Sequence, residues 1–117
     1  MHYLILIADN EKQWEALSEA EMGRVIGEFA AYSDELKRGG HYVVGRQLAP
    51  SHLARTLRTR QGRLETVDGP FAETKEQIGG FHLISARDQQ EAERLAARCP
   101  GAKYGTVELR PVIENGA

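Results

Sequence analysis

Asp68 and His52 are the two side chains of this sequence whose surroundings best suit proton transfer. Asp68 opens the run DGPFAETKEQIGGF at 68–81, and His52 stands three positions ahead of Arg55. An imidazole titrates near neutral pH, and a carboxylate can exchange a proton with a bound substrate. The residue types therefore point to acid–base catalysis, with Asp68 transferring the proton and His52 as its partner or as an anion binder.

Four further side chains complete this candidate site. Arg55 is a clamp for a substrate carboxylate, because a guanidinium binds a carboxylate through two parallel hydrogen bonds. Tyr42 offers a hydroxyl that would orient the substrate. Lys75 and Glu76 either line a cleft beside the sheet or form a solvated ion pair of little energetic value.

Asp68 and His52 also have purely structural explanations. Asp68 can bond to backbone donors beyond it, Gly69 tolerates unusual dihedral angles, and Pro70 fixes φ, so the three residues predict a sharp turn. His52 would then be an ordinary loop histidine. The turn accounts for the neighbours of Asp68 better than catalysis does.

The rest of the run 68–81 predicts how the chain continues after this turn. Phe71 is expected to fill the core at the turn. The glycines at 79 and 80 are expected to let the backbone pass close to another element as the next strand begins. Residues 73–76, with the sequence ETKE, form a charged turn or a single helical turn.

Metal ions, disulfides and cofactors have little support in the sequence. No two of the four histidines have the i,i+4 or i,i+2 spacing of a metal site. Cys99 is the single cysteine, which excludes an internal disulfide and a cysteine-based metal cluster, and it is expected to be a small buried hydrophobe. We expect neither a metal nor a cofactor.

Positive charge is concentrated in the middle of a chain whose formal net charge is −2. No acidic residue lies between Glu35 and Glu65, whereas seven basic residues do. The block is either a solvated hairpin edge or a surface for an acidic partner. Nucleic acid is disfavoured, because no aromatic side chains that could stack on bases alternate with the arginines.

The order of the predicted elements is strand, helix, strand, hairpin, strand, helix, strand. Ser18 and Glu21 form a capping box at the start of the first helix, and Asp88 with Glu91 begins the second. The strands lie near 3–8, 42–48, 80–85 and 106–109, and the hairpin spans 53–67 around Gln61-Gly62.

This order predicts a ferredoxin-like α+β fold over residues 1–117, one domain with an antiparallel sheet, two helices on one face and an extra β-hairpin. The first strand, HYLILIA, is apolar on both faces, so the second face also needs cover. A second copy is the simplest cover, which predicts a homodimer. No apolar stretch is long enough to span a membrane and the start lacks the features of a signal peptide, so we expect a soluble cytoplasmic protein.

The run DGPFAETKEQIGGF resembles the DGPF-type branch of the YCII-related domain family. The opening MHYLILI, the segment HLARTLR at 52–58 and the closing GTVELRP at 105–111 extend the resemblance over nearly the whole chain. It implies a dimeric ferredoxin-like, or α/β-barrel-like, fold. In the wider family a histidine and an aspartate are proposed as a catalytic pair, and some relatives resemble small lyases or isomerases.

The chain departs from that pattern at the histidine. Residues 14–22, at the start of the first helix, contain none, so the resemblance carries over only Asp68. DGPF-type proteins are also linked with extracytoplasmic-function sigma factors. Two functions follow: a homodimer that binds a small anionic or aromatic metabolite with cofactor-independent lyase or isomerase chemistry, or a non-catalytic regulatory module associated with transcription.

Overall fold

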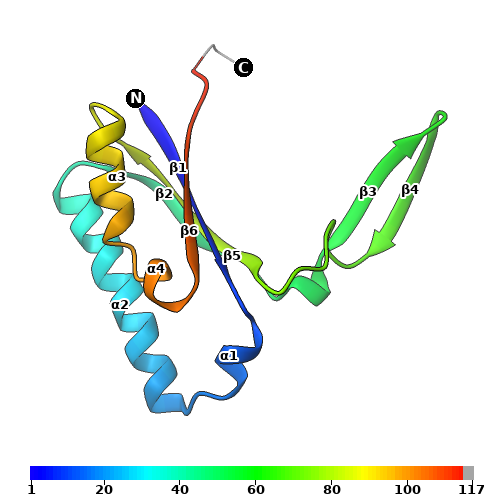
Figure 1. Cartoon of the computed structure of the whole chain (residues 1–117), viewed down its shortest axis with the longest axis horizontal. Helices are drawn as coiled ribbons and strands as arrows, with labels where there is room; N and C mark the ends of the chain where they lie inside the picture. The colour runs from blue at the N-terminus through cyan, green and yellow to red at the C-terminus, as the bar shows by residue number, and fades with distance from the viewer. Residues whose placement is uncertain (115–117) are drawn as a thin grey trace.

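The computed structural model describes residues 1–114, and β1 (His2–Asp9) lies inside its four-stranded antiparallel sheet. The sheet has the order β2-β5-β1-β6, in which β2 is Tyr42–Gln47, β5 is Gln77–Ser85 and β6 is Thr106–Pro111. β1 pairs with both β5 and β6, and β2 pairs with the outer side of β5. This order, with a helix after the first strand and another before the last, is the predicted ferredoxin-like fold (Figure 1).

Two longer helices cover one face of the sheet. These are α2 (Glu19–Arg38) and α3 (Gln89–Ala97), and Figure 1 shows both on the same side of the strands. Single turns of helix, α1 (Lys12–Glu15), η1 (Ser51–Leu53) and α4 (Gly101–Tyr104), shape the connections. None of the helices in residues 1–114 has the length and hydrophobicity that crossing a membrane would require.

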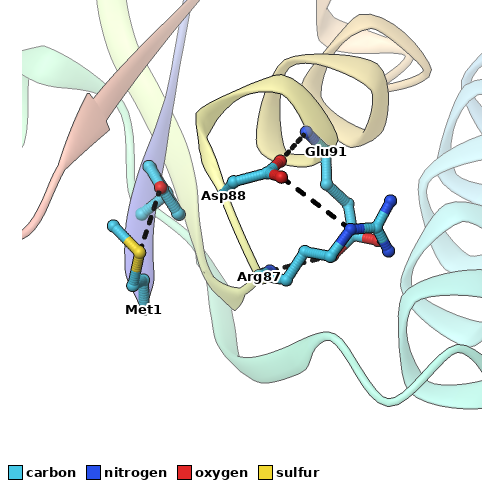
Figure 2. A network of polar contacts seen from close by, with 5 residues as sticks. Met1, Arg87, Asp88 and Glu91 are labelled. Carbon is cyan, nitrogen blue, oxygen red and sulfur yellow. Dashed lines mark hydrogen bonds and ion pairs between the residues drawn. The ribbon is translucent and has the colours of Figure 1, made fainter.

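Side-chain caps fix where α2 and α3 begin. Ser18 Oγ accepts a hydrogen bond from the Glu21 amide, and Glu21 Oε1 accepts one from the Ser18 amide, both at 3.1 Å. This reciprocal pair is the predicted capping box, which satisfies amides that the first turn leaves free. At α3, Asp88 Oδ1 accepts from the Glu91 amide at 2.8 Å, and the Glu91 side chain reaches back to Arg87 (Figure 2).

The core lies between the sheet and the two long helices. β1 directs Tyr3, Ile5 and Ile7 toward the helices, and all three are buried. The Tyr32 hydroxyl of α2 donates to the carbonyl oxygen of Leu95 in α3 at 2.7 Å, which ties the two helices together. The remaining core residues come from α2, β5, α3 and the segments that follow β5 and α3: Leu36, Ile84, Ala86, Ala92, Ala96 and Cys99.

The opposite face of the sheet is also apolar at its centre. Leu4 and Leu6 of β1 pair with Leu83 and Phe81 of β5, and all four are partly exposed. We call these four residues the open face. The prediction that β1 is apolar on both sides is therefore confirmed, and within residues 1–114 the helices cover only one of them.

A β-ribbon projects from the sheet between β2 and β5. It consists of β3 (Arg55–Arg60) and β4 (Arg63–Asp68), joined by Gln61 and Gly62, whose φ values of 51° and 77° fit a two-residue hairpin turn. We call residues 55–68 the arm, and it confirms the predicted hairpin. Because of the arm, the radius of gyration is 16.2 Å, whereas a compact domain of this length has about 13 Å.

The prediction that Phe71 fills the core is wrong. Its side chain is 79% exposed and lies against the Arg58 guanidinium, 5.3 Å from the ring centre. The turn at 68–70 lies at the base of the arm, so Phe71, which comes next, lies beside the arm and not in the core. Residues 73–76 form a loop without helix, and β5 begins at Gln77, three residues earlier than predicted.

Candidate functional site

Asp68 and Arg55 meet at the base of the arm. They are opposite each other in the register of β3 and β4, and Arg55 Nε lies 2.9 Å from Asp68 Oδ1. The side chain of Arg55 is 60% exposed and that of Asp68 is 87% exposed. An ion pair this exposed contributes little to stability and is surrounded by water. The structure thus joins two predicted site residues on an open surface.

The other predicted site residues are spread over the fold. His52 is exposed in η1, and Lys75 is exposed in the loop before β5. Tyr42 lies at the end of β2 remote from the arm, where its hydroxyl accepts from the Gly45 amide at 2.9 Å. Glu76 Oε1 accepts from the Thr106 hydroxyl at 2.8 Å. The predicted residues therefore occupy four separate places, and their catalytic and binding roles stay predictions.

Asp9 is the buried carboxyl group that the sequence prediction missed. It ends β1 on the side that faces the helices and is 8% exposed. The Trp14 indole Nε1 donates a hydrogen bond to its Oδ1 at 3.1 Å. Burial raises the pKa of Asp9, the negative charges of Glu11 and Glu76 raise it further, and the bond from Trp14 partly opposes them. A carboxyl with a raised pKa is suited to proton transfer near neutral pH.

Two glycines lie next to Asp9, and one of them, Gly105, leaves room that a side chain would take. A Cβ on Gly105, just before β6, would lie 2.9 Å from Asp9 Cβ and 2.2 Å from the Ala8 carbonyl oxygen. Gly79 sits at the register shift between β1 and β5, and a Cβ there would stand 3.5 Å from Asp9 Oδ2. A Cβ on Gly80 would lie 3.0 Å from the Arg46 carbonyl oxygen. The predicted close approach to another element is therefore confirmed at Gly80, whereas a Cβ on Gly79 would make an ordinary contact.

Trp14 also lines a hollow of about 340 Å³. The rings of Trp14 and Tyr104 stand edge to face with centres 5.5 Å apart, and the Gln13 side-chain amide donates to the Tyr104 carbonyl oxygen at 2.9 Å. Arg24 brings a positive charge to the hollow. The residues that line it are Gln13, Trp14, Leu17, Glu21, Arg24, Val25 and Tyr104. Trp14 therefore contacts both the hollow and the buried carboxyl.

His82 is a second buried polar side chain, but it is surrounded by core residues. It is 7% exposed, its Nε2 shares a hydrogen bond of 3.3 Å with the Ser33 hydroxyl, and the Tyr32 ring meets it edge to face at 5.4 Å. Its Nδ1 has no hydrogen-bond partner within residues 1–114. Burial lowers the pKa of His82, so the ring is neutral at pH 7. His82 is therefore a packed core histidine.

Metal and thiol chemistry find little basis in the described part of the chain. Residues 1–114 contain no group of three or more histidine, cysteine, aspartate or glutamate side chains placed to hold a metal ion. Cys99 is buried, and burial raises the pKa of its thiol, so the reactive thiolate is disfavoured. The prediction that Cys99 is a buried hydrophobe is confirmed.

Comparison with known proteins assigns the domain. The YCII-related domain family matches residues 1–115. The chain is a member of the YCII-related domain family. A curated relative of this YCII-related domain, an uncharacterised protein of Rhizobium meliloti (strain 1021), is 35% identical over 114 residues, which cover 96% of the chain and 92% of the relative.

A solved structure supports the fold of this YCII-related domain. It is the 5-chloro-2-hydroxyhydroquinone dehydrochlorinase of Burkholderia phenoliruptrix AC1100, in complex with 2,5-dihydroxybenzoquinone. The TM-score is 0.55 at 17% identity, over 98% of this chain and 96% of the enzyme. At this level of identity the similarity shows a shared fold.

The sequence did hold a signal for Asp9. The buried positions of β1 are the odd-numbered ones, and Asp9 continues the series after Tyr3, Ile5 and Ile7. A charged residue in phase with a buried strand face is rare unless it is paired or functional. The expected strand ended at Ala8, one residue too early for this signal to be used.

Proposed function

We propose that this YCII-related domain is a homodimer that binds a small anionic or aromatic metabolite and performs cofactor-independent acid–base chemistry of the lyase or isomerase type. We place it in the DGPF-type branch, as a single domain acting in the cytoplasm. The last three residues of the predicted domain, 115–117, lie outside the described residues. The observation that carries the proposal is the buried carboxyl of Asp9 with its raised pKa.

The hollow beside Trp14 supplies the features that such a ligand needs. Trp14 and Tyr104 offer aromatic surfaces, and Arg24 offers a positive charge for an anionic group. The carboxylate of Glu21 is already engaged by the amide of Ser18, so it competes less for Arg24. A volume of about 340 Å³ is in the range of small-molecule sites.

Asp9 is the proton-transferring group in this proposal, in place of Asp68. A general acid or base must come within ~3 Å of the substrate proton, and the Trp14 side chain both bonds to Asp9 and lines the hollow. The ligand displaces the indole and takes over its hydrogen bond to Oδ1. Asp9, protonated more readily than an exposed aspartate, then donates or accepts the proton.

The solved enzyme supports the class of ligand. It is named for a chlorinated hydroxyhydroquinone and was solved with a dihydroxybenzoquinone. Both compounds are small oxygen-substituted six-membered rings, which fit between aromatic side chains and lose protons readily. The same fold in this chain favours a hydroxylated ring as the first ligand to test.

The homodimer is supported by the open face. Leu4, Leu6, Phe81 and Leu83 form an apolar surface at the centre of a sheet that the helices cover on one side only. Burial of such a surface is favourable by about 25 cal/mol per Å². A second copy placed sheet to sheet would bury it on both molecules.

Trp14 makes the ligand test direct, because it is the single tryptophan of the chain. Titration with 2,5-dihydroxybenzoquinone should quench its fluorescence after correction for absorption with free N-acetyltryptophanamide. The same ligand should raise the melting temperature. In Asp9→Asn the affinity should fall tenfold or more, whereas Asp68→Asn, the matched change at the exposed aspartate, should bind as wild type does.

Two results would redirect the proposal. Loss of binding in Asp68→Asn with Asp9→Asn unaffected would restore the carboxylate at the base of the arm as the functional one. If neither this quinone nor hydroxybenzoates change fluorescence or melting temperature, the small-molecule site is rejected. The non-catalytic regulatory module would then be the better explanation of the fold.

A further inference from the structure

The arm is a part of the molecule that the proposed small-molecule site does not use. Its strands β3 and β4 form a two-stranded sheet of their own. A hydrogen bond of 2.8 Å from the Gly69 amide to the Ala54 carbonyl oxygen closes its base. An isolated two-stranded ribbon is marginally stable in water unless something packs on it. The arm therefore needs a surface to lie against.

The two faces of the arm differ in chemistry. Residues directly opposite in the register share a face, and faces alternate along each strand. Leu57 pairs with Thr66 and Thr59 with Leu64, and these four make up what we call the leucine face; the ion pair of Arg55 and Asp68 lies on the same side, at the base of the arm. The opposite face carries mainly charged side chains, namely Arg58, Arg60, Arg63 and Glu65, with Thr56 and Val67 nearer the base. Leu57 and Leu64 are 59% and 65% exposed, so the leucine face is an uncovered apolar surface.

The direction of the arm indicates where its partner lies. Figure 1 shows the arm on the side of the sheet opposite to α2 and α3, which is the side of the open face. Each strand of the arm has six residues, which corresponds to about 20 Å. The arm and the open face thus enclose an angle, and a second molecule seated on the open face is within reach of the arm.

Charge favours a second copy of this chain as that molecule. The arm holds four arginines and two acidic residues, a net charge of +2. The whole chain has a formal net charge of −2, so the remainder carries −4. A basic arm and an acidic body on the same chain are complementary between two copies. In a twofold pair each arm would meet the other body.

We propose that the arm clasps the second copy, with its leucine face packed on the body of the partner. This inference rests on the homodimer proposed above and assigns the arm a role in it. Both arms engage reciprocally, so every contact is made twice. The apolar contact contributes to affinity, and the net positive charge of the arm favours approach to the acidic partner.

The test is sedimentation equilibrium of variants whose substitutions leave the body untouched. In the armless variant two glycines replace residues 55–68, joining Ala54 to Gly69, which are already at hydrogen-bond distance. The leucine-face variants are Leu57→Asp and Leu64→Asp, each made alone. The matched control, Val67→Asp, places the same charge on the opposite face at a residue that is also exposed. Circular dichroism confirms that each variant is folded.

We expect the armless and the leucine-face variants to raise the dimer dissociation constant tenfold or more, and Val67→Asp to change it less than threefold. A dimer as tight without the arm as with it overturns the clasp and leaves the homodimer standing. The leucine face is overturned as the contact surface if Val67→Asp weakens the dimer as much as the leucine variants do. A wild-type chain that is monomeric at micromolar concentration rejects both the homodimer and the clasp.

Discussion

The His82 ring fills the space above Gly45, where β5 and β2 pair. A Cβ atom on Gly45 would stand 2.6 Å from Cδ2 of this ring, closer than two such atoms can approach. The rings of Tyr32 and Tyr42 contact the same imidazole edge to face, at 5.4 Å and 6.4 Å. The missing side chain of Gly45 therefore leaves the space that the buried histidine fills.

Gly45→Ala should destabilise the fold by about 1–3 kcal/mol, the usual cost of forcing atoms into a packed core. Urea unfolding measures the change. In a His82→Ala background the cost of Gly45→Ala should be much smaller, because the ring that clashes is gone. The difference between the two costs measures the interaction between position 45 and the His82 ring. Gly27→Ala in α2 is the control: nothing lies within 4 Å of its Cβ position, so it should stabilise the helix by roughly 0.5–1 kcal/mol. Additive effects of Gly45→Ala and His82→Ala would contradict this account.

His82 should make the fold sensitive to mild acid. Its pKa is lowered by burial, so the unfolded chain takes up a proton near pH 6.5 whereas the native state resists it. The native state then binds fewer protons, and stability falls as the pH drops from 6.5 through the lower native pKa. Melting temperatures of wild type and His82→Gln between pH 8 and pH 5 should diverge over this interval, with the wild type losing more. Parallel curves would show that another group dominates.

Asp9 should act on stability in the opposite direction. Its pKa is raised, so the native state binds the proton more readily, and stability falls as the pH rises from the ordinary value of 3.8 through the higher native pKa. Asp9→Asn removes the buried charge and should be more stable than wild type at pH 7 by about 0.5–2 kcal/mol, as is common at functional positions. The difference should shrink at pH 3.5. A less stable Asp9→Asn at pH 7 would show that the carboxylate is structural.

Trp14→Phe should raise the pKa of Asp9 further, because the indole hydrogen bond lowers it in the wild type. The carboxyl carbon of Asp9, followed by NMR over pH, gives the midpoint directly. Tyr104→Phe is a suitable control, since its hydroxyl donates to Glu28 at 2.8 Å and leaves Asp9 untouched. An unchanged midpoint in Trp14→Phe would show that the indole does not stabilise the carboxylate in solution.

Local sequence signals predicted most of the fold. The capping box at Ser18 and Glu21, the cap at Asp88 and the Gln61-Gly62 turn each depend on residues within a few positions, so their geometry follows from the chain itself. The apolar alternation in β1 predicted the sheet and its two faces. Once these elements were in place, few arrangements of the strands remained.

The candidate site was harder to predict, because it depends on contacts between distant residues. Asp9 lies beside Gly79 and Gly105, which are 70 and 96 positions away in the chain. Phe71 shows the reverse error: an aromatic after a turn was expected to be buried, yet the turn belongs to an arm that leaves the core. Tertiary structure decides which side chains contact a buried carboxyl and which lie beside a projecting ribbon.

The hydrogen bond between Ala54 and Gly69 also bears on how this chain can evolve. Its 2.8 Å contact places the entry and the exit of the ribbon at one point, so cross-strand residues can be added or lost in pairs while β2 and β5 keep their places. Natural variants could thereby have a shorter arm, a longer arm or a different arm in its place. The ferredoxin-like framework would persist unaltered beneath each version.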